Sequence, residues 1–443
     1  MSETVKKSIL QPNISKINLA TLLFAAFGSA LMLFVSFGQE FVLTVFLKVP
    51  LDKQGVVGGT LQSVREIVVL FSIILGGVLA DKFGRRIIFS TGFLLITVGF
   101  FLFPFAETSL QLTFFYAISG IGAAFITGML TTVLADYVVP ESRGKFTGLQ
   151  AVLNTFGAMF ILFGIKRLPK TLSDSGMPIL DAGTTTYRIV SVLCLSVAII
   201  LWFGLYKGKI SQSVEKTNQK GFLGILVEGI LEAKKPGVAL AYFAGFISRS
   251  DLVVVGVFLT LWINKVAINE RGMNPADATA KVGAILGIGA ISQLFLGFLI
   301  GYLVDYIGKK RSRVDSLAVA AFIGVIAYGV LFFITDPLGN GLLLAMILLA
   351  IAQIFGIIAS QVFITQQARP EIRGSVIGFF GVCGALAQII LAYLGGFMFD
   401  KWSPNAPFVL VAILNLILLL LCFTLRPYIK NDAAESNEIV ITH

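Results

Sequence analysis

The sequence has almost no histidine: its only one, His443, is the last residue. Zinc centres and Ser-His-Asp triads both rely on histidine side chains held inside a fold. The sequence also contains no glycine-rich phosphate-binding loop and no pair of catalytic carboxylates in a soluble domain. We therefore expect no metal, no cofactor and no enzymatic activity.

Cysteine is nearly as scarce. The three cysteines, Cys194, Cys383 and Cys422, all fall inside apolar runs, and no two of them form a C-x-x-C pair. Such residues behave as small hydrophobic side chains. The sequence thus predicts neither a disulfide framework nor a redox motif.

Charge is the third shortage. Charged residues make up 13% of the 443 residues and hydrophobic residues 56%, whereas roughly 25% of the residues of a soluble protein are charged. Water could not cover this much apolar surface, so the chain is predicted to lie in a lipid bilayer. Basic loops facing an anionic membrane leaflet explain the net charge of +10 better than nucleic acid does.

Apolar runs long enough to cross a bilayer, about 20 residues each, are abundant. The first run is too long for a signal peptide and has no clear cleavage site, so it is expected to remain as a span. Twelve spans are predicted, with the limits 18–47, 55–80, 87–105, 109–138, 145–166, 187–206, 238–263, 280–304, 314–334, 338–367, 374–398 and 406–425.

One long connection, 207–237, divides these spans into two sets of six. Lysine and arginine concentrate in the segments that face the cytoplasm when the N-terminus is placed there. Both termini are therefore expected inside. The compact chain with short outer loops suggests a bacterial inner (plasma) membrane, and the protein is expected to be a monomer. The expected segments are an N-terminal segment 1–17, a bundle 18–206, a linker 207–237, a bundle 238–426 and a tail 427–443.

The linker contains a short amphipathic stretch, which predicts a helix lying on the inner membrane surface. Its apolar and polar positions are, respectively, Phe222, Ile225, Leu226 and Ile230, and Glu228, Glu232, Lys234 and Lys235.

The two halves of the chain resemble each other. The stretch "GGVLADKFGRR" (76–86) follows the second span, and "GFLIGYLVDYIGKKR" (297–311) lies at the equivalent place in the second half. Likewise "VVPESRGKFTGL" (138–149) is matched by "ARPEIRGSVIGF" (368–379) after the fourth span of each half. Two matches at equivalent places indicate a duplicated six-helix unit with a central cavity.

These motifs, the twelve spans and the long middle connection resemble the major facilitator superfamily over the whole chain. "GVLADKFGRR" is close to the family loop G-x-L-A-D-R-x-G-R-R, with Lys82 in place of its first arginine, and "PESRG" matches P-x-x-R-G. The second copy departs further from the family loop, since Tyr306 takes the place of this basic residue. The resemblance implies an all-α membrane protein of two pseudo-symmetric six-helix bundles that transports by alternating access.

The motif pattern of that family also implies a cytoplasmic gate. Asp81 lies at the end of its helix, where the helix dipole disfavours an anion, and the family comparison suggests Arg143 as its partner. Such a pair would form when the cytoplasmic side closes, although the arginines could instead serve only to fix orientation. The gate candidates are Gly77, Asp81, Gly84, Arg85, Arg86, Arg143, Asp305, Gly308, Lys309 and Arg373.

Ionisable residues inside the spans need a partner, water or a role, because a charge at mid-bilayer costs roughly 3 kcal/mol. Arg249 and Asp251 are two residues apart and so point to different faces of one helix. In the second span Gln62, Arg65 and Glu66 form a polar stripe, an intramembrane charge network.

Family architecture places the first, fourth, seventh and tenth spans around the cavity. The cavity candidates are Glu40, Arg249, Asp251, Gln293, Gln353 and Gln388, and the candidates for proton coupling are Asp251, Glu66 and Glu40. The alternative for the charged residues is that they form ion pairs that only hold the bundle together.

The sequence therefore predicts a secondary active transporter, coupled to protons, for a small organic solute. Arg249 favours an anion or zwitterion. The alternatives are a proton-driven exporter of drugs or metabolites and an uncoupled facilitator; a non-transporting scaffold would not need charges inside spans of both halves.

Overall fold

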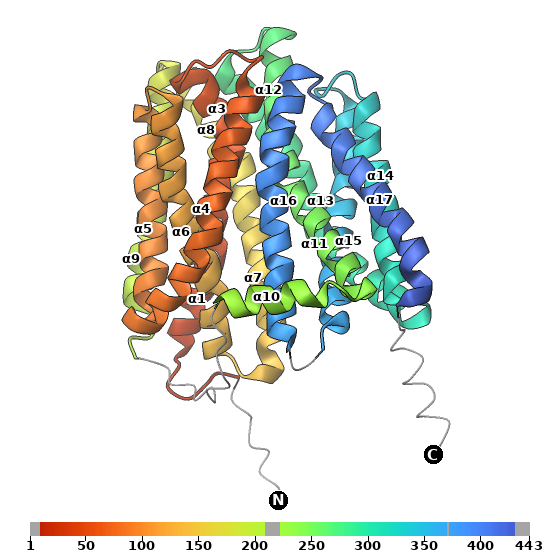
Figure 1. Cartoon of the computed structure of the whole chain (residues 1–443). Coiled ribbons are helices and arrows are strands. Elements are labelled where there is room, and N and C mark those ends of the chain that lie inside the picture. Colours follow the sequence, from red (N-terminus) through yellow and green to blue (C-terminus); the bar gives the residue numbers. More distant parts are fainter. Residues whose placement is uncertain (1–8, 209–221, 370–371, 430–443) are drawn as a thin grey trace, which may run out of the picture. The chain divides into compact units, whose positions relative to one another are not determined.

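The computed structural model describes residues 9–208, 222–369 and 372–429, and it is almost entirely helical (Figure 1). The described residues contain twelve helices long and apolar enough to cross a membrane, which confirms the predicted number of spans. Parts of the predicted N-terminal segment, linker and tail (1–8, 209–221 and 430–443) lie outside the described residues, as do 370–371.

Three spans are interrupted, and two others, the third and the twelfth, end in a short 3-10 helix. The first combines α1 (Lys16–Gly28), α2 (Phe34–Phe37) and α3 (Gln39–Phe41) with a 3-10 turn and a π turn; the fifth combines α7 (Pro140–Met159) and α8 (Leu168–Asp174), and the seventh α11 (Pro236–Val253) and α12 (Thr260–Asn269). The remaining helices are α4 (Gln54–Phe83), α5 (Arg85–Leu102), α6 (Ser109–Tyr137), α9 (Ile179–Gly204), α10 (Phe222–Glu232), α13 (Pro275–Lys310), α14 (Arg313–Phe333), α15 (Asn340–Gln367), α16 (Arg373–Lys401) and α17 (Ala406–Leu425).

Local chemistry explains where several of these helices begin. Ser15, Thr108 and Ser312 each accept a hydrogen bond from a backbone N–H in the first turn of the following helix, as favourable N-cap residues do. Between α4 and α5 the chain turns at Gly84, whose φ of 100° is accessible to glycine at little cost. The turn of the first motif therefore depends on Gly84.

The chain folds as two compact units. The first comprises Met1–Val49, Val64–Thr217 and Asn274–Gly283, and the second Pro50–Ser63, Asn218–Met273 and Ala284–His443. The start of α4 therefore belongs to the second unit and the start of α13 to the first.

An aromatic cluster forms the centre of the first unit. The rings of Phe103 and Tyr116 stack with centroids 5.0 Å apart. The ring centroid of Tyr187 lies 5.2 Å from that of Phe34 and 6.1 Å from that of Phe100. Aromatic pairs of this kind add to the hydrophobic stabilisation of a core. They surround the interrupted part of the first span.

In the second unit α14 packs against α15 and α17, and α11 packs against α15 and α16. The helix α10 lies across α16 in Figure 1, and the Glu228 carboxylate accepts a hydrogen bond of 2.7 Å from Ser375 of α16. Val227, Ile230 and Leu231 of α10 are more than half exposed. The helix thus packs on the unit partly through Glu228 and leaves these three apolar side chains uncovered.

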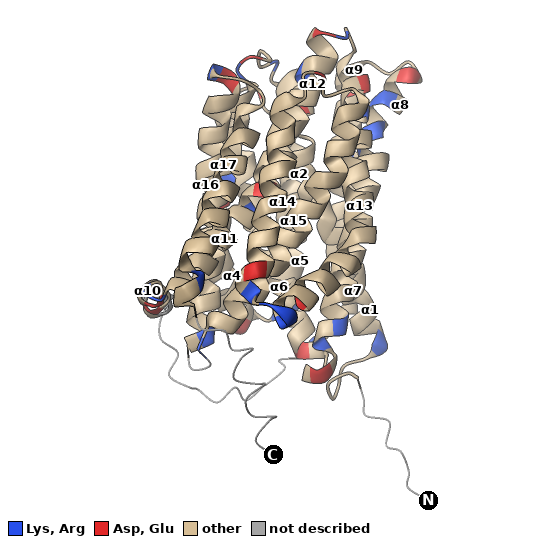
Figure 2. Cartoon of the chain, turned by 90° about the vertical axis from the view of Figure 1, so that its right-hand side faces the viewer, with Lys and Arg blue, Asp and Glu red and all other residues tan. Residues whose placement is uncertain are grey.

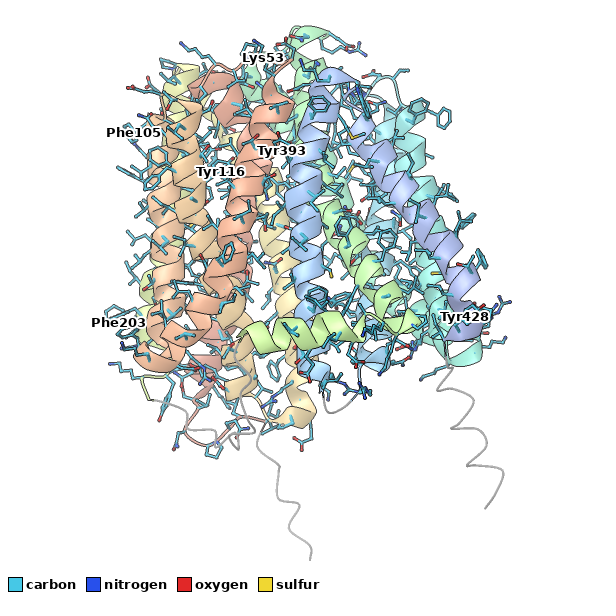
Figure 3. The ribbon with its side chains drawn as sticks, viewed as in Figure 1. Lys53, Phe105, Tyr116, Phe203, Tyr393 and Tyr428 are labelled. Atoms are coloured by element: carbon cyan, nitrogen blue, oxygen red, sulfur yellow. The ribbon has the colours of Figure 1, made fainter. Side chains whose placement is uncertain are left out.

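Charged residues gather at the helix ends of each unit, with few at mid-helix (Figure 2). Large apolar side chains cover the outer sides instead, among them Phe105, Phe203, Tyr393 and Tyr428, whereas Tyr116 points inward (Figure 3). This distribution is that of helices whose outer sides contact lipid.

Candidate functional site

The first span is broken next to Glu40. It leaves α-helical geometry at Ser29–Leu33, ends α2 before Gly38, and continues through α3 into the π turn Val42–Phe46. Interrupted transmembrane helices persist only where other groups satisfy their freed backbone. The polar contacts around this break identify those groups.

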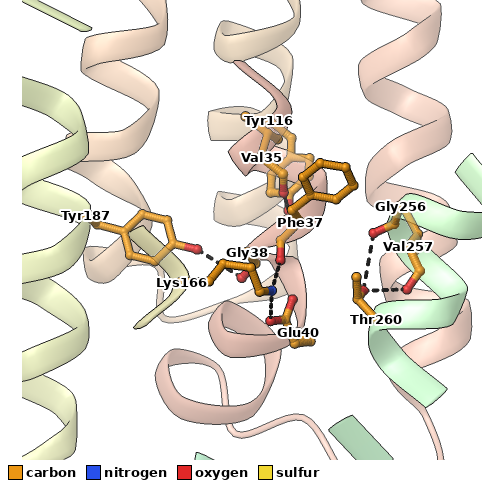
Figure 4. Close-up of polar contacts among 10 residues, drawn as sticks. All are labelled: Val35, Phe37, Gly38, Glu40, Tyr116, Lys166, Tyr187, Gly256, Val257 and Thr260. Atoms are coloured by element: carbon orange, nitrogen blue, oxygen red, sulfur yellow. Dashed lines mark hydrogen bonds and ion pairs between the residues drawn. The ribbon is translucent and has the colours of Figure 1, made fainter. Parts of the chain in front are cut away.

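Side chains from three other segments bind the carbonyl groups of the break (Figure 4). The Tyr116 hydroxyl donates to the Val35 carbonyl at 3.0 Å, and the Tyr187 hydroxyl donates to the Gly38 carbonyl at 2.9 Å. Between them, the Lys166 ammonium donates to the Phe37 carbonyl. The break is therefore held by the rest of the first unit.

Lys166 also forms an ion pair with Glu40, and both side chains are completely buried. The sequence analysis identified Glu40 but placed Lys166 at the end of the fifth span. The fifth span in fact extends from Pro140 to Asp174, which puts Lys166 well inside it. The only sequence signal was the continuation of the helical pattern beyond Lys166 into "RLPKTLSD".

The polar stripe of the second span forms an ion pair within α4. Arg65 Nη1 lies 2.6 Å from Glu66 Oε1, and both side chains are about nine-tenths buried. Gln62 is buried beside them. Arg65 and Glu66 thus form an ion pair, as in the alternative in which the charged residues only hold the bundle together. The two residues are neighbours in one helix, however, so the pair does not join two helices.

Asp251 lies in the interior of the second unit. It lines a small cavity together with Ser248, Tyr328, Asn415 and Gly356, from α11, α14, α17 and α15. The volume open to a water-sized sphere is about 20 Å³, enough for one water molecule. Every residue that lines it belongs to the second unit.

The Asp251 carboxylate has no cationic partner among the described residues, and its Oδ1 atom accepts no hydrogen bond from them. The Tyr328 hydroxyl is the polar group that faces it. Beyond Tyr328, Gln293 Nε2 donates to Gln353 Oε1 at 2.7 Å. Asp251 is therefore a buried acid whose surroundings are polar but not basic.

Arg249 and Asp251 point in different directions, as their spacing predicted. Asp251 is 5% exposed, whereas Arg249 is exposed and its aliphatic part crosses α16 at Gly384, where a Cβ would lie 2.6 Å from Arg249 Cγ. Gln388 of α16 is half-buried. Arg249 thus keeps access to water although it lies in the middle of a span.

At the end of α4, the basic residues of the first motif bind an acid that the sequence analysis missed. Arg85 pairs with Asp136 of α6 at 2.8 Å, and Arg86 donates to the Trp202 carbonyl at 3.0 Å. Arg143 donates to the carbonyl groups of Ala135 and Val138.

No ion pair joins Asp81 to Arg143 in the described part of the chain, so the predicted latch is not formed in this conformation. The Arg143 guanidinium instead donates its hydrogen bonds to the carbonyl groups at the end of α6. A Cβ at Gly77 or at Gly84 would meet no other atom within 4 Å. The Asp81 side chain is exposed.

In the second motif copy, the acid pairs with a residue that was not among the gate candidates. Asp305 pairs with Arg313 of α14 at 2.9 Å, while Lys309 and Arg373 are exposed. A Cβ at Gly308 would lie 2.4 Å from Arg313 Cδ, so Gly308 provides the room in which the Arg313 side chain crosses the helix.

Comparisons with known proteins agree with this architecture. The sequence model of the Major Facilitator Superfamily matches residues 19–386 and 313–439. The chain is 25% identical to the magnetosome protein MamH of Paramagnetospirillum magneticum over 86% of its own length and 85% of that protein. It is 26% identical to the multidrug resistance protein MdtH of Aeromonas hydrophila over 84% of its length and 87% of that protein.

Other matches are more distant or partial. The chain spans just over half (56%) of the magnetosome protein MamZ of Magnetospirillum gryphiswaldense, at 23% identity over 84% of its own length. Among solved structures, the nucleoside transporter NupG superposes with a TM-score of 0.71 at 16% identity, covering 94% of this chain and all of that one. The D-xylose-proton symporter superposes with a TM-score of 0.67 at 17% identity, over 91% and 97% of the two chains.

Proposed function

Because the chain belongs to the Major Facilitator Superfamily of membrane transporters, we propose that it is a secondary active transporter that couples a small organic solute to protons by alternating access. We also propose that it works as a monomer in a bacterial inner membrane, with both termini in the cytoplasm and without a cofactor. No enzymatic activity is assigned to it.

The observation that carries proton coupling is the isolation of Asp251. A carboxyl group shielded from water and without a basic partner is a site where a proton can be held, and the cavity beside Asp251 has room for a water molecule. Glu66 and Glu40 are less suited to this role, because Arg65 and Lys166 already neutralise them. Asp251 is therefore the proposed proton carrier. Gln293 and Gln353 are the polar groups that lie beyond Tyr328 from Asp251.

Arg249 supports an anionic or zwitterionic solute. A guanidinium that is exposed in the middle of a span is positioned to attract a carboxylate or phosphate. The similarity to an arabinose-proton symporter of Bacillus subtilis, 21% identical over 86% of this chain, agrees with proton coupling.

Export is the second candidate function. Its support is the similarity to proteins described as multidrug resistance proteins, over 84% of the chain for one and 98% for another. Transport direction separates the two functions: everted vesicles would accumulate the solute if the protein exports it, and right-side-out vesicles would do so if it imports it.

The test begins with purified protein and a panel of anions, zwitterions and neutral solutes, read as thermal stabilisation. An anion that stabilises the unmodified protein but not Arg249→Ala would identify the solute class; equal stabilisation of both would refute the role of Arg249. The identified solute is then used in proteoliposomes with an imposed proton gradient.

In proteoliposomes we expect Asp251→Asn to lose proton-driven accumulation while solute exchange without a gradient persists. Glu66→Gln is the matched comparison, because its acid is already paired with Arg65. Full proton-driven accumulation by Asp251→Asn would refute the coupling role of this residue. Equilibration of the solute without accumulation, whether or not a gradient is imposed, would show that the unmodified protein is an uncoupled facilitator.

A further inference from the structure

Three polar atoms at the break in the first span have no hydrogen-bond partner among the described residues. Gln39 is completely buried, and neither its Oε1 nor its Nε2 atom has such a partner. The same holds for Oε2 of the adjacent Glu40, whose other oxygen binds Lys166. Together these atoms offer two acceptors and an amide donor side by side.

The backbone of the break does not need them. The carbonyl groups of Val35, Phe37 and Gly38 already accept hydrogen bonds from Tyr116, Lys166 and Tyr187. Leaving a buried amide unsatisfied costs about 1–3 kcal/mol, so Gln39 weakens the fold unless another group binds it. A side chain that serves only packing could be replaced by leucine without this cost.

The neighbouring residues indicate which way Gln39 points. Phe41 packs against α9, where a Cβ at Gly183 would lie 2.3 Å from its ring, and Glu40 faces Lys166. Successive residues of a helix are about 100° apart, so Gln39 lies on the far side of Glu40 from Phe41. Its amide is therefore directed away from α9 and out of the aromatic cluster of the first unit.

We propose that Gln39 and the free oxygen of Glu40 form a solute-recognition site for a neutral group that both donates and accepts hydrogen bonds. The hydroxyl groups of a polyhydroxylated solute fit this description. The proposal rests on the transport function above and adds a hydrogen-bonding group to the solute that is transported.

Charge determines this choice of ligand. Lys166 balances the charge of Glu40, so the site as a whole is neutral and a second cation would lack a counter-ion. An anionic group at this site would approach the Glu40 carboxylate directly and be repelled. A neighbouring pair of hydroxyl groups can instead donate to Glu40 Oε2 and Gln39 Oε1 and accept from Gln39 Nε2.

The experiment compares the full-length protein with Gln39→Leu, using Gln353→Leu as the control. Gln353 is a buried glutamine that does have a protein partner, Gln293. Without any probe, we expect Gln39→Leu to leave the melting temperature unchanged or raise it, and Gln353→Leu to lower it. A fall for Gln39→Leu as large as that for Gln353→Leu would show that Gln39 has a structural role and would overturn the proposal.

The probes are D-xylose, D-gluconate and citrate, with binding read as a shift of the melting temperature. We expect at least one polyhydroxylated probe, neutral D-xylose or anionic D-gluconate, to stabilise the unmodified protein, and Gln39→Leu to bind it about tenfold more weakly, the loss that about 1.4 kcal/mol produces. Stabilisation by citrate alone, or by none of the three, would overturn the assigned solute class.

Asp251→Asn separates this proposal from proton coupling. It should keep the response to the hydroxylated probe, because Asp251 lies in the other unit. If Asp251→Asn retains coupling while Gln39→Leu loses the probe, only the coupling assignment fails. If Gln39→Leu binds the probe normally, only the recognition site fails.

Discussion

Lys166 is the residue whose placement has the largest energetic consequence. Its ammonium is completely buried between the Phe37 carbonyl and the Glu40 carboxylate. A buried ion pair usually contributes no more stability than apolar side chains of the same size would, yet removal of one partner leaves an uncompensated charge. Removal of one partner is therefore expected to destabilise the fold strongly, whereas replacement of both by uncharged side chains should cost little.

We predict that Lys166→Met lowers the free energy of unfolding by about 3–5 kcal/mol, because it leaves Glu40 alone in the interior. The double variant Glu40→Gln/Lys166→Met should recover most of this loss. Chemical denaturation of the purified protein in detergent measures both.

Lys170→Met is the control, since Lys170 pairs with Asp174 and Asp277 at a site that is one-third exposed. It should change stability much less than Lys166→Met. A double variant as unstable as Lys166→Met would contradict the account, because the cost would then not come from the stranded charge.

Residue spacing predicted some of these features and left others open. The separation of Arg249 from Asp251 follows from helix geometry alone, and the sequence analysis stated it. The partners of Glu40 and Arg85 did not follow, because Lys166 and Asp136 are distant in sequence and only packing brings them together. Nothing in the sequence singles out Gln39, because burial without a hydrogen-bond partner is visible only in three dimensions.

At the scale of elements, α4 begins on a carboxylate from another helix. Asp400 Oδ1 accepts from the Gly55 N–H at 2.9 Å and Oδ2 accepts from the Val56 N–H at 2.7 Å. An acidic side chain here satisfies free N–H groups and interacts favourably with the helix dipole. Asp400 of α16 thus acts as a cap for the first turn of α4.

We predict that Asp400→Ala destabilises this contact by about 1 kcal/mol, the usual cost of losing a cap. Hydrogen exchange of the amides at the start of α4 should become faster, while exchange elsewhere in α4 stays the same. Asp52→Ala is the matched control, because Asp52 lies just before α4 without capping it. Equal exchange in the Asp400→Ala and unmodified proteins would rule out the cap.

The helix α10 is attached through Glu232, which pairs with Lys235 at 2.8 Å and also with Arg369. The hydrogen bond from Lys235 and then that from Arg369 hold the pKa of Glu232 below its usual range. A depressed pKa in the folded state means that the attachment is fully present above the ordinary glutamate pKa of about 4.3 and is lost as pH falls through the lower folded value.

We predict that a spin label at Val227 becomes more mobile as pH falls below about 4, because protonated Glu232 releases Lys235 and Arg369. In Glu232→Gln the mobility should be high and independent of pH in this range. Asp336→Asn is the control, since the pKa of Asp336 is also lowered, by the Leu338 N–H and Arg271, but in a connection between α14 and α15. A pH profile that Glu232→Gln leaves intact would assign the effect to another group.

At the scale of the whole molecule, the sequence predicted the twelve spans and the two halves, because apolar length and repeated motifs are local properties. It did not predict that Pro50–Ser63 and Asn274–Gly283 would each group with the other half. Those groupings depend on close approaches such as that of Gly283 to the Leu162 carbonyl, where a Cβ would lie 2.3 Å away. No feature of composition reveals which glycines meet a neighbour.

Gly59 makes the closest of these approaches between α4 and α16. A Cβ at Gly59 would lie 2.1 Å from the Ala392 carbonyl oxygen, and Ser63, one turn further, donates to the Ile389 carbonyl at 2.9 Å. Alternating access as proposed here requires contacts that join the two halves of the sequence to form and part in turn. A larger side chain at Gly59 should prevent this one from forming.

We therefore predict that Gly59→Leu holds α4 and α16 apart without unfolding either helix. The reporter is Ser63→Cys in a Cys383→Ser background, labelled by a membrane-impermeant maleimide. Its reactivity should rise about tenfold, the population change that about 1.4 kcal/mol produces, and proton-driven accumulation should fall because the cycle cannot close this contact. Gly329→Leu is the control, since a Cβ at Gly329 meets no atom within 4 Å. Unchanged labelling of a folded Gly59→Leu protein would contradict the prediction that a larger side chain holds this contact open.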